Sequence, residues 1–402
     1  MGARPVTSWR CRWCGTDDGS VVLDLGEQPA ADAFPPAGAT GADDVYPLRM
    51  VLCAGCGLAQ LEEDPTDADE PRGIEPAALV AQAREAVDDL AAAGLAASGA
   101  RVAEQPSPHG GSWLGQLAER GLTIVPDEPG ADDEQRVDLL VDSLGMMHDA
   151  DQRAALADRA GRLAPEGVLA LHVHPLGTIL RTSAWNALRH GHYAYYSVTW
   201  LVRAAREVGL VPVGLWRYAL YGGTVVLALV PAGSRRAAEH AGSAALADLD
   251  QVLDDERAAG VTDPDAVGRL QAEVTTTATA LRAWVDDHCA EGIVGYGAAS
   301  RAVALLAAAG VTGRDVRAVV DASAAKHGLS MPGTAGADGA PRIPIVEPAA
   351  LGGLRPRWVV LFVPDLLDEV RRAYPEVEAS GGSWVVAEPA PVVVAPDGVT
   401  TR

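Results

Sequence analysis

Four cysteines stand in two pairs that have the spacing of a metal site. Each pair, Cys11 with Cys14 and Cys53 with Cys56, encloses two residues, and 38 residues separate the two pairs. This spacing lets both thiolates of a pair face one ion, and four thiolates favour tetrahedral zinc. A glycine directly follows each pair, where a tight turn needs a residue that tolerates positive φ. Because four cysteines leave no open coordination position, we expect a structural zinc ion; the alternative is four buried free thiols.

Histidines form the second group of residues that could do chemistry. Six of the nine fall in one stretch of the chain: His109, His148, His172, His174, His190 and His192. Histidine titrates near neutral pH and therefore suits proton transfer, although a structural hydrogen bond is the alternative for any single one. His190 and His192 are the strongest candidates. They flank Gly191, and in an extended segment both rings would point to one side.

Charge and composition narrow the class of protein. The 402 residues include 54 acidic and 32 basic side chains, which gives a net charge of −22. Such a surface repels phosphate backbones and anionic lipids. The apolar runs are far shorter than the roughly 20 residues that span a bilayer, and the N-terminus lacks a signal-type apolar stretch. We therefore expect a soluble, cytoplasmic protein that binds neither nucleic acid nor membranes.

The elements that must position these residues group into three domains. A length of 402 residues exceeds what one core usually holds. An acidic stretch at 62–71, which contains two prolines, predicts a linker after the cysteine module. Alternating strand and helix patterns then predict α/β structure. We expect domain boundaries at 1–66, 67–233 and 234–402.

Within the second domain, strands are expected at 102–104, 122–126, 137–142 and 168–174, with a helix at 149–163 that residues 165–167 close by a turn. The histidines lie near the ends of these strands, where doubly wound sheets build their sites. In the third domain, residues 292–301 read as a strand, a glycine turn and an alanine-rich helix. Further strands are expected at 316–320 and 358–363, which predicts a Rossmann-like unit.

Three segments of the chain carry motifs in a familiar order. The first joins the two cysteine pairs with Asp24-Leu25-Gly26-Glu27-Gln28-Pro29 and Tyr46-Pro47-Leu48. The second is His190-Gly191-His192-Tyr193-Ala194-Tyr195-Tyr196-Ser197 with Tyr221-Gly222-Gly223-Thr224. The third is Gly295-Tyr296-Gly297-Ala298-Ala299 with the segments at 320–328, 332–334 and 343–345. Together they resemble the sugar C-methyltransferases of deoxysugar biosynthesis, a family that acts on nucleotide-linked 4-keto sugars.

The resemblance implies an α/β protein with a zinc-binding N-terminal module, a Rossmann-like class I methyltransferase domain and a C-terminal Rossmann-like domain. It also implies S-adenosyl-L-methionine (SAM) as cofactor. The glycine turn after the first SAM strand corresponds to residues 104–111. The residues expected at the cofactor are Glu104, His109, Gly110, Gly111, Asp127 and Asp142. For Asp127, which would hold ribose hydroxyls, a solvated acidic turn is the alternative.

Two departures from the family pattern bear on function. The family's Tyr-x-Glu-His run is replaced by Arg189-His190-Gly191-His192, so only His192 keeps its type. A short acidic stretch at 129–136 is all that separates the second strand from the strand at 137. This leaves no room for the usual helix and third strand, and we expect one βα unit to be missing.

The chemistry that the resemblance implies is methylation of a carbon next to a ketone. On this reading His192 is the base that removes the acidic proton, and His190 or Tyr195 assists. The residues expected at the nucleotide-sugar substrate are Tyr196, Tyr221, Gly222, Gly223, Gly295, Tyr296, Gly297, Arg301 and Lys326. For the Gly-Tyr-Gly run, a purely structural turn is the alternative.

Two other functions remain open at the level of the sequence. The shortened cofactor domain and the altered run at 189–192 are compatible with an enzyme that no longer uses SAM and performs acid/base chemistry, such as cyclisation, isomerisation or elimination. A non-catalytic ligand-binding protein is the third reading. The concentration of histidines and tyrosines argues against it, because a pure scaffold has no need of titratable groups in a cleft.

Overall fold

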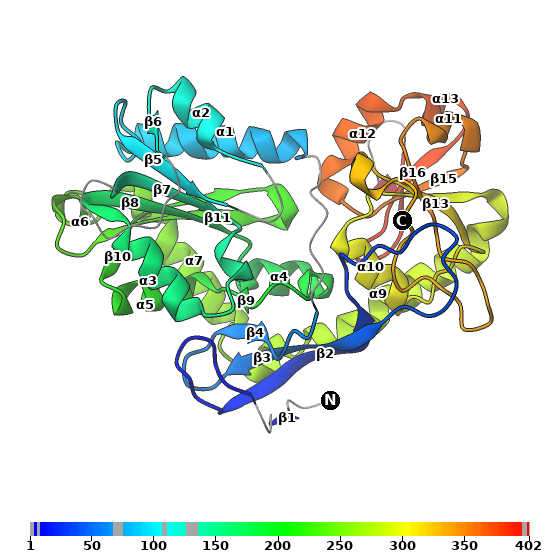
Figure 1. Cartoon of the computed structure of the whole chain (residues 1–402), viewed down its shortest axis with the longest axis horizontal. Coiled ribbons are helices and arrows are strands. Elements are labelled where there is room, and N and C mark those ends of the chain that lie inside the picture. Colours follow the sequence, from blue (N-terminus) through cyan, green and yellow to red (C-terminus); the bar gives the residue numbers. More distant parts are fainter. Residues whose placement is uncertain are drawn as a thin grey trace.

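The computed structural model describes residues 9–66, 75–106, 111–125 and 136–395, together with the backbone of 4–5 and 400–401. Two α/β domains lie side by side above a small N-terminal sheet (Figure 1). The N-terminal sheet contacts both of them, because its long strand β2 packs on helices α8 and α9 of the C-terminal part while its strand β4 pairs with the middle domain. The structure contains three separate sheets.

The N-terminal sheet is antiparallel and has the strand order β1-β2-β3-β4-β9. Its strands are β1 (Arg4–Pro5), β2 (Gly19–Pro29), β3 (Val45–Cys53), β4 (Ala59–Leu61) and β9 (Ala194–Tyr195). The last of these comes from the middle of the chain. The segment with the histidine run is therefore joined to the cysteine module by a β-ladder.

The middle sheet has the strand order β10-β11-β8-β7-β5-β6. Its strands are β5 (Arg101–Gln105), β6 (Thr123–Ile124), β7 (Val137–Ser143), β8 (Leu163–Val173), β10 (Leu210–Tyr218) and β11 (Thr224–Pro231). The first four are parallel, and β11 and β10 continue the sheet antiparallel. Among the described residues β6 is the edge strand, in agreement with the expected loss of one βα unit; residues 126–135 are not described.

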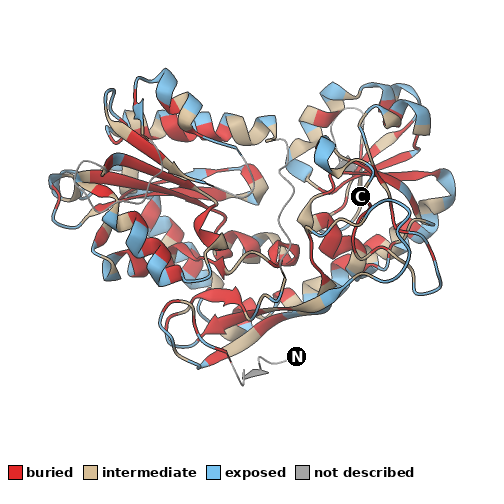
Figure 2. Ribbon diagram, viewed as in Figure 1, coloured by how far each residue is buried: buried red, intermediate tan, exposed pale blue. Residues whose placement is uncertain are grey.

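Helices cover both faces of the middle sheet (Figure 1). One layer holds α1 (Ala77–Ala92) and α2 (Leu114–Glu119); the other holds α3 (Gln152–Gly161), α5 (Val198–Glu207) and α7 (Ala247–Ala259). The central strands between them are largely buried (Figure 2), which explains why β11 is almost continuously apolar. Shorter helices are α4 (Leu176–Thr182) and α6 (Arg235–Glu239).

Two local expectations differ from the structure. The boundary at 233/234 assigns α7 to the C-terminal domain, but Leu249 and Val252 of α7 pack in the same core as Trp200 of α5. The expected turn at 165–167 lies inside β8 instead. Opposite β7 the pairing jumps from Leu163 to Val168, so the extra residues form a bulge rather than a helix-to-strand turn.

The C-terminal sheet has the strand order β14-β13-β12-β15-β16-β17-β18. Its strands are β12 (Ile293–Tyr296), β13 (Val316–Val320), β14 (Ile345–Val346), β15 (Trp358–Leu361), β16 (Ser383–Val386), β17 (Val392–Val394) and β18 (Thr400–Thr401). Its helices are α8 (Pro264–Val267), α9 (Leu270–His288), α10 (Ser300–Ala308), α11 (Ala350–Leu354), α12 (Leu367–Ala373) and α13 (Glu376–Ala379). Numbered along the chain, the five parallel strands have the order 3-2-1-4-5, which is that of a Rossmann sheet. The expected Rossmann-like unit is confirmed. Among the residues described, no helix is both long and apolar enough to cross a membrane.

Candidate functional site

The four cysteines of the N-terminal module come together in one cluster. Their Sγ atoms all lie within 4.8 Å of one another. The Sγ atoms of Cys11 and Cys56 are 3.5 Å apart, and those of Cys14 and Cys53 are 3.6 Å apart. Zinc–sulfur bonds of about 2.3 Å in a tetrahedron place the sulfurs roughly 3.8 Å apart, so the donor set fits Zn²⁺. The expected zinc site is borne out by this geometry.

Gln60 supports the cysteine cluster from behind. Its side chain is fully buried, its Nε2 donates to Cys11 Sγ at 3.3 Å, and its Oε1 accepts from the Arg12 backbone N–H at 2.9 Å. Outer hydrogen bonds of this kind orient metal ligands. Gln60 also belongs to β4, where it pairs with Ala194 of β9.

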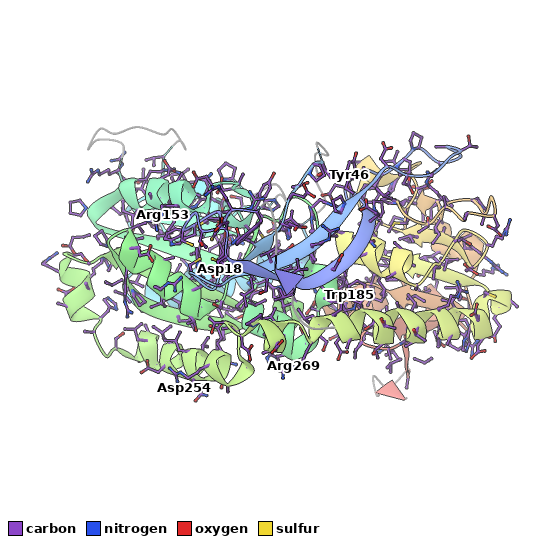
Figure 3. All side chains as sticks on the ribbon, turned by 90° about the horizontal axis from the view of Figure 1, so that it is seen from below. Asp18, Tyr46, Arg153, Trp185, Asp254 and Arg269 are labelled. Carbon is purple, nitrogen blue, oxygen red and sulfur yellow. The ribbon has the colours of Figure 1, made fainter. Side chains whose placement is uncertain are left out.

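The cysteine module holds the segment that carries His192. Besides the β4–β9 ladder, the Leu61 N–H donates to the Tyr193 carbonyl at 3.1 Å. The Gly191 N–H donates to Asp64 Oδ2 at 2.6 Å. In the view from below, the hairpin of β2 and β3, which carries Tyr46, runs across the junction between the two larger domains (Figure 3). The N-terminal module therefore fixes the backbone on both sides of His192.

A cavity of 330 Å³ lies between the middle and the C-terminal domains. This volume is in the range of small-molecule sites, about 300–1,000 Å³. The candidate residues expected from the sequence that line it are His174, His192, Tyr195, Tyr221, Tyr296, Gly297, Arg301 and Lys326. Described residues from that analysis that do not line it are His190, Tyr196, Gly222, Gly223, Gly295, Glu104, Gly111 and Asp142. His109, Gly110 and Asp127 lie outside the described residues.

His192 stands at the centre of an aromatic group on the cavity wall. The ring of His148 meets it edge-on at a centroid distance of 4.8 Å, and the ring of Tyr195 lies 6.3 Å away. His148 follows strand β7 in a short 3-10 helix, Met146–His148. The sequence analysis placed His148 in the histidine cluster but gave it no role; its position after a strand of the parallel sheet was the available signal.

His190 does not share the cavity with His192, contrary to the expectation for this pair. Its Nε2 lies 3.2 Å from the Pro47 carbonyl oxygen, and its ring packs edge-on against Tyr46 at 6.0 Å. Gly191 has φ +81°, so the chain turns between the two histidines instead of running extended. The two rings therefore face different sides.

The two tyrosines after His192 have structural hydrogen bonds. The Tyr195 hydroxyl accepts from the Arg189 backbone N–H at 3.0 Å, so Tyr195 presents its ring, not a free hydroxyl, to the cavity. The Tyr196 hydroxyl donates to Gln152 Oε1 at 2.5 Å in the core of the middle domain. Burial raises the pKa of both phenols. Neither phenol is placed as a neutral-pH proton acceptor.

Arg189, which stands where the family has a tyrosine, is part of the cavity wall. Its Nη2 lies 2.5 Å from Oδ2 of Asp32, and both side chains are largely buried. Asp32 belongs to the N-terminal module, so this ion pair joins that module to the cavity. The Asp32 carboxylate offsets the positive charge of the arginine within the cavity wall.

Two acidic residues expected at the cofactor, Glu104 and Asp142, have hydrogen-bond or ion-pair partners within the protein. Glu104 accepts from the Trp113 N–H at 2.7 Å and from the Ser112 hydroxyl. Asp142 is fully buried, accepts from the Gly145 N–H at 2.8 Å and lies 2.5 Å from Arg159 Nε. Both carboxylate oxygens of Asp142 are thus engaged by the protein, and Asp142 does not line the cavity.

Gly111 lies next to the cavity rather than in its wall. It has φ +83°, and a Cβ added there would sit 2.4 Å from Oε1 of Glu75. Glu75 does line the cavity, together with Leu79, Leu144 and Met147. Any side chain larger than that of glycine at 111 would displace this carboxylate.

The C-terminal wall is built at the carboxyl ends of β12 and β13. Asp321 directly follows β13, and its carboxylate accepts from the Ala298 N–H at 2.7 Å and the Ser323 N–H at 2.8 Å. Lys326 Nζ donates to the Ala298 carbonyl at 2.8 Å. In a Rossmann unit an acidic residue at this strand end meets a ribose. The sequence analysis missed Asp321 as a site residue, although its place directly after the second strand was visible.

The glycines near this wall shape its backbone. Gly295 lies in β12 where a Cβ would sit 2.7 Å from the Phe362 ring. Gly222 and Gly223 both have positive φ and follow Tyr221, which itself has φ +57°. The Tyr221 N–H donates to Asp365 Oδ1 at 3.1 Å. A non-glycine residue in this conformation is strained, and such strain gathers at functional sites.

Matches to known proteins agree with this arrangement. Residues 11–69 match a family model described as a putative zinc binding domain, and residues 219–389 match one described as a C-methyltransferase C-terminal domain. C-methyltransferase NovU of Streptomyces niveus is 24% identical, and the similarity covers 97% of each chain.

Solved methyltransferase structures match part of the chain. The 1,6-didemethyltoxoflavin-N1-methyltransferase of Burkholderia thailandensis is 14% identical, with 43% of this chain and 95% of that chain covered at a TM-score of 0.27. Magnesium protoporphyrin IX methyltransferase of Synechocystis PCC 6803 is 13% identical, with 40% and 90% covered, also at 0.27.

The two family models stand in their order along the chain, and the similarity to a C-methyltransferase extends over nearly its whole length. The cysteine cluster supplies the metal site that the first model describes. The chain is therefore similar to C-methyltransferases along nearly its whole length, from an N-terminal zinc-binding domain to a C-methyltransferase C-terminal domain.

Proposed function

We propose that the protein transfers a methyl group from SAM to a carbon next to the ketone of a nucleotide-linked sugar, with His192 as the base. The observation that carries this proposal is the cavity between the two α/β domains. It brings His192 of the middle domain together with Arg301 and Lys326 of the C-terminal domain. A cofactor and a nucleotide-bearing acceptor can meet in such a cavity from opposite sides.

The middle-domain wall fits the cofactor. Glu75, Leu79, Leu144 and Met147 line it beside the carboxyl ends of the parallel strands, where ligands of such sheets bind. Apolar side chains and one carboxylate suit a ligand that has a flat base and a cationic end. When bound, SAM supplies an electrophilic methyl group.

The C-terminal wall fits the nucleotide end of the acceptor. Asp321 offers carboxylate oxygens to ribose hydroxyls, and Arg301 and Lys326 offer positive charge to a diphosphate. Gly297, with φ +91°, opens the turn after β12 so that a ligand can approach the backbone. Arg189, a further basic residue of the wall, is paired with Asp32, so Arg301 and Lys326 are the cations offered to an anionic group.

The proposed reaction moves one proton and one methyl group. His192 takes the proton from the carbon next to the ketone, and the electron pair of that C–H bond passes onto the ketone oxygen. The pair returns as the carbon bonds to the methyl group, which SAM would supply with S-adenosylhomocysteine as the leaving group. His192 lies on the cavity wall with its ring held by His148 and Tyr195, as a positioned base requires.

The test compares two histidines that lie two positions apart. Zinc-loaded protein is given isotopically labelled SAM and, as probes, dTDP- and UDP-linked 4-keto-6-deoxyhexoses, and the products are analysed by mass spectrometry and NMR. His192→Ala should lower kcat by about 100-fold or more, the range of general-base effects. His190→Ala, outside the cavity, should change kcat by less than about threefold.

A new carbon–methyl bond next to the ketone is the expected product. If SAM is not consumed but His192→Ala still abolishes turnover of a ketone probe, the SAM-free acid/base alternative replaces this proposal. If no probe is turned over and the His192 and His190 variants bind ligands alike, the proposed role of His192 is wrong.

A further inference from the structure

We propose that His174 donates a hydrogen bond from its Nε2–H to the ketone oxygen of the acceptor as negative charge develops on that oxygen. His174 would thus be a catalytic residue with a task opposite to that of His192, which takes a proton. The inference rests on the proposed function, because it needs an acceptor with a ketone. Its first test, however, concerns the ring itself and needs no substrate.

His174 occupies the place where a parallel sheet presents its functional groups. It directly follows β8, which ends at Val173, and it lines the same cavity as His192. Only 8% of its surface is exposed. The ring of Tyr221 meets it at a centroid distance of 6.4 Å, so His174 is held between the middle-domain sheet and the strained turn at Tyr221.

Arg301 decides which ring nitrogen carries the proton. The Nη2 atom of Arg301 lies 3.5 Å from Nδ1 of His174. A guanidinium only donates hydrogen bonds, so Nδ1 must accept, and the proton of the neutral ring then resides on Nε2. Arg301 comes from the first turn of α10 in the C-terminal domain and stacks over the Tyr221 ring at 5.4 Å. Arg301 is a positioning residue in this arrangement.

The Nε2 atom is the ring nitrogen whose hydrogen bonding is left unsatisfied. It is buried and has no hydrogen-bond partner among the described residues. The backbone of Tyr221 lies close enough to favour a protonated ring, but it forms no hydrogen bond of normal geometry with Nε2. A buried donor without an acceptor is costly, and an oxygen of a bound ligand would satisfy it.

The ring stays neutral in this environment. Burial and, after it, the charge of Arg301 lower the pKa of His174 to about 3. A neutral imidazole cannot serve as a strong acid, but its N–H can stabilise an oxyanion, as positioned donors in water-poor sites do. The enolate oxygen accepts more strongly than the ketone oxygen, so the bond strengthens toward the transition state.

The first experiment determines the tautomer. ¹⁵N NMR spectra of labelled, zinc-loaded protein are recorded between pH 6 and 8, and the His174 signal is assigned by its loss in His174→Gln. The expected result is a neutral ring protonated at Nε2 over this whole interval. In Arg301→Met, the share of the Nδ1–H tautomer should rise. A charged ring, or an Nδ1–H tautomer in the wild type, would overturn the proposal.

The second experiment separates catalysis from packing. Exchange of the proton next to the ketone is followed in D₂O with the dTDP-linked 4-keto-6-deoxyhexose and S-adenosylhomocysteine present. His174→Ala should lower kcat for exchange by about 100-fold, the cost of one oxyanion donor, with KM changed by less than about threefold. His174→Gln, whose side-chain amide N–H reaches a similar place, should recover at least about tenfold of that loss.

Equal losses in the two variants, with a matching fall in thermal stability, would show a structural role and overturn the proposal. So would wild-type kcat in His174→Ala. A wild-type protein that has the Nε2–H tautomer but neither exchanges nor methylates the probe would contradict the proposed function, while the assignment of the tautomer would stand.

Discussion

Asp142 and Arg159 form a buried ion pair that holds the end of β7 in place. Arg159 also reaches Asp149 Oδ2 at 2.9 Å, and Asp142 Oδ1 accepts from the N–H groups of Gly145 and Met146. These bonds fix the short helix that ends at His148. Asp142, which was expected at the cofactor from the sequence, thus holds the backbone that follows β7 next to the cavity.

Removing one member of this pair should destabilise the protein without a direct effect on cofactor affinity. Asp142→Ala leaves the Arg159 charge buried and should lower the apparent free energy of unfolding by about 3–5 kcal/mol. Urea denaturation followed by tryptophan fluorescence measures this change. Asp158→Ala, in the same helix as Arg159, should stay within about 0.5 kcal/mol. Unchanged stability in Asp142→Ala, with weaker S-adenosylhomocysteine binding, would restore the cofactor role.

The buried His172 makes stability depend on pH. Its Nε2 lies 2.8 Å from Gln82 Nε2, its Nδ1 lies 2.9 Å from Ser143 Oγ, and burial lowers its pKa to about 4. The unfolded chain binds a proton at about pH 6.5 and the folded chain does not. Stability is therefore lost as the pH falls from about 6.5 to 4, by about 1.4 kcal/mol per pH unit for one such group.

The matching experiment replaces His172 by glutamine. Unfolding of the wild type and of His172→Gln is measured by urea denaturation between pH 7 and 4.5. Toward acid pH, the free energy of unfolding of the variant should fall less steeply than that of the wild type. The difference in slope should be close to that of one bound proton. Parallel curves would show that His172 does not titrate in the way its burial implies.

At the scale of elements, the ladder between β4 and β9 makes the zinc site relevant to catalysis. Ala59 pairs with Tyr195 and Gln60 with Ala194, only a few residues from Cys56 and from His192. Without zinc, the four thiolates would repel one another or take up protons. Either change would loosen the cysteine module and release strand β9 from β4. The zinc ion is thus expected to position His192 through the backbone, although it takes no part in the chemistry.

Zinc removal should loosen both strands of this ladder. After treatment with a chelator, hydrogen–deuterium exchange should accelerate in peptides that cover 59–61 and 193–195, and methyl transfer should fall. Exchange in β7 serves as the internal control, because it lies in the core of the middle sheet. Unchanged exchange at 193–195 in the metal-free protein would show that the ladder does not depend on zinc.

Elements were predictable where burial gives a simple pattern. The apolar residues at 139–141 and 168–171 identify strands β7 and β8 directly. The packing of α7 on the middle domain and the bulge in β8 were not predictable, because each depends on which distant surface the segment meets. The same holds for His190: a single positive φ at Gly191 turns its ring away, and spacing alone does not reveal that.

At the scale of the whole molecule, the cavity exists because two domains meet. Asn186 of the middle domain donates from Nδ2 to both oxygens of Glu388 in the C-terminal domain, at 2.9 and 2.8 Å. Burial raises the pKa of Glu388, and the Asn186 bonds act against this. The sequence placed Arg301 and Lys326 at the substrate but offered no sign of this contact, which joins residues 202 positions apart.

Loss of the Asn186 contact should weaken the docking of the two domains. In Asn186→Ala the Glu388 carboxylate has no amide donor, a loss of about 1–3 kcal/mol. We expect KM for the nucleotide sugar to rise by about tenfold or more, since 1.4 kcal/mol is tenfold in affinity, with little change in S-adenosylhomocysteine binding. Gln251→Ala, whose partner Asp255 is exposed on α7, is the control. A KM that stays at the wild-type value would show that docking does not depend on this contact.

The central claim is that the shortened middle domain still binds the methyl donor in the cavity beside Glu75. Calorimetric titration of the zinc-loaded protein with S-adenosylhomocysteine tests it most directly. The account predicts micromolar binding that Gly111→Leu abolishes, because the new side chain displaces the Glu75 carboxylate. No binding at millimolar ligand, or equal binding in Gly111→Leu, would contradict it.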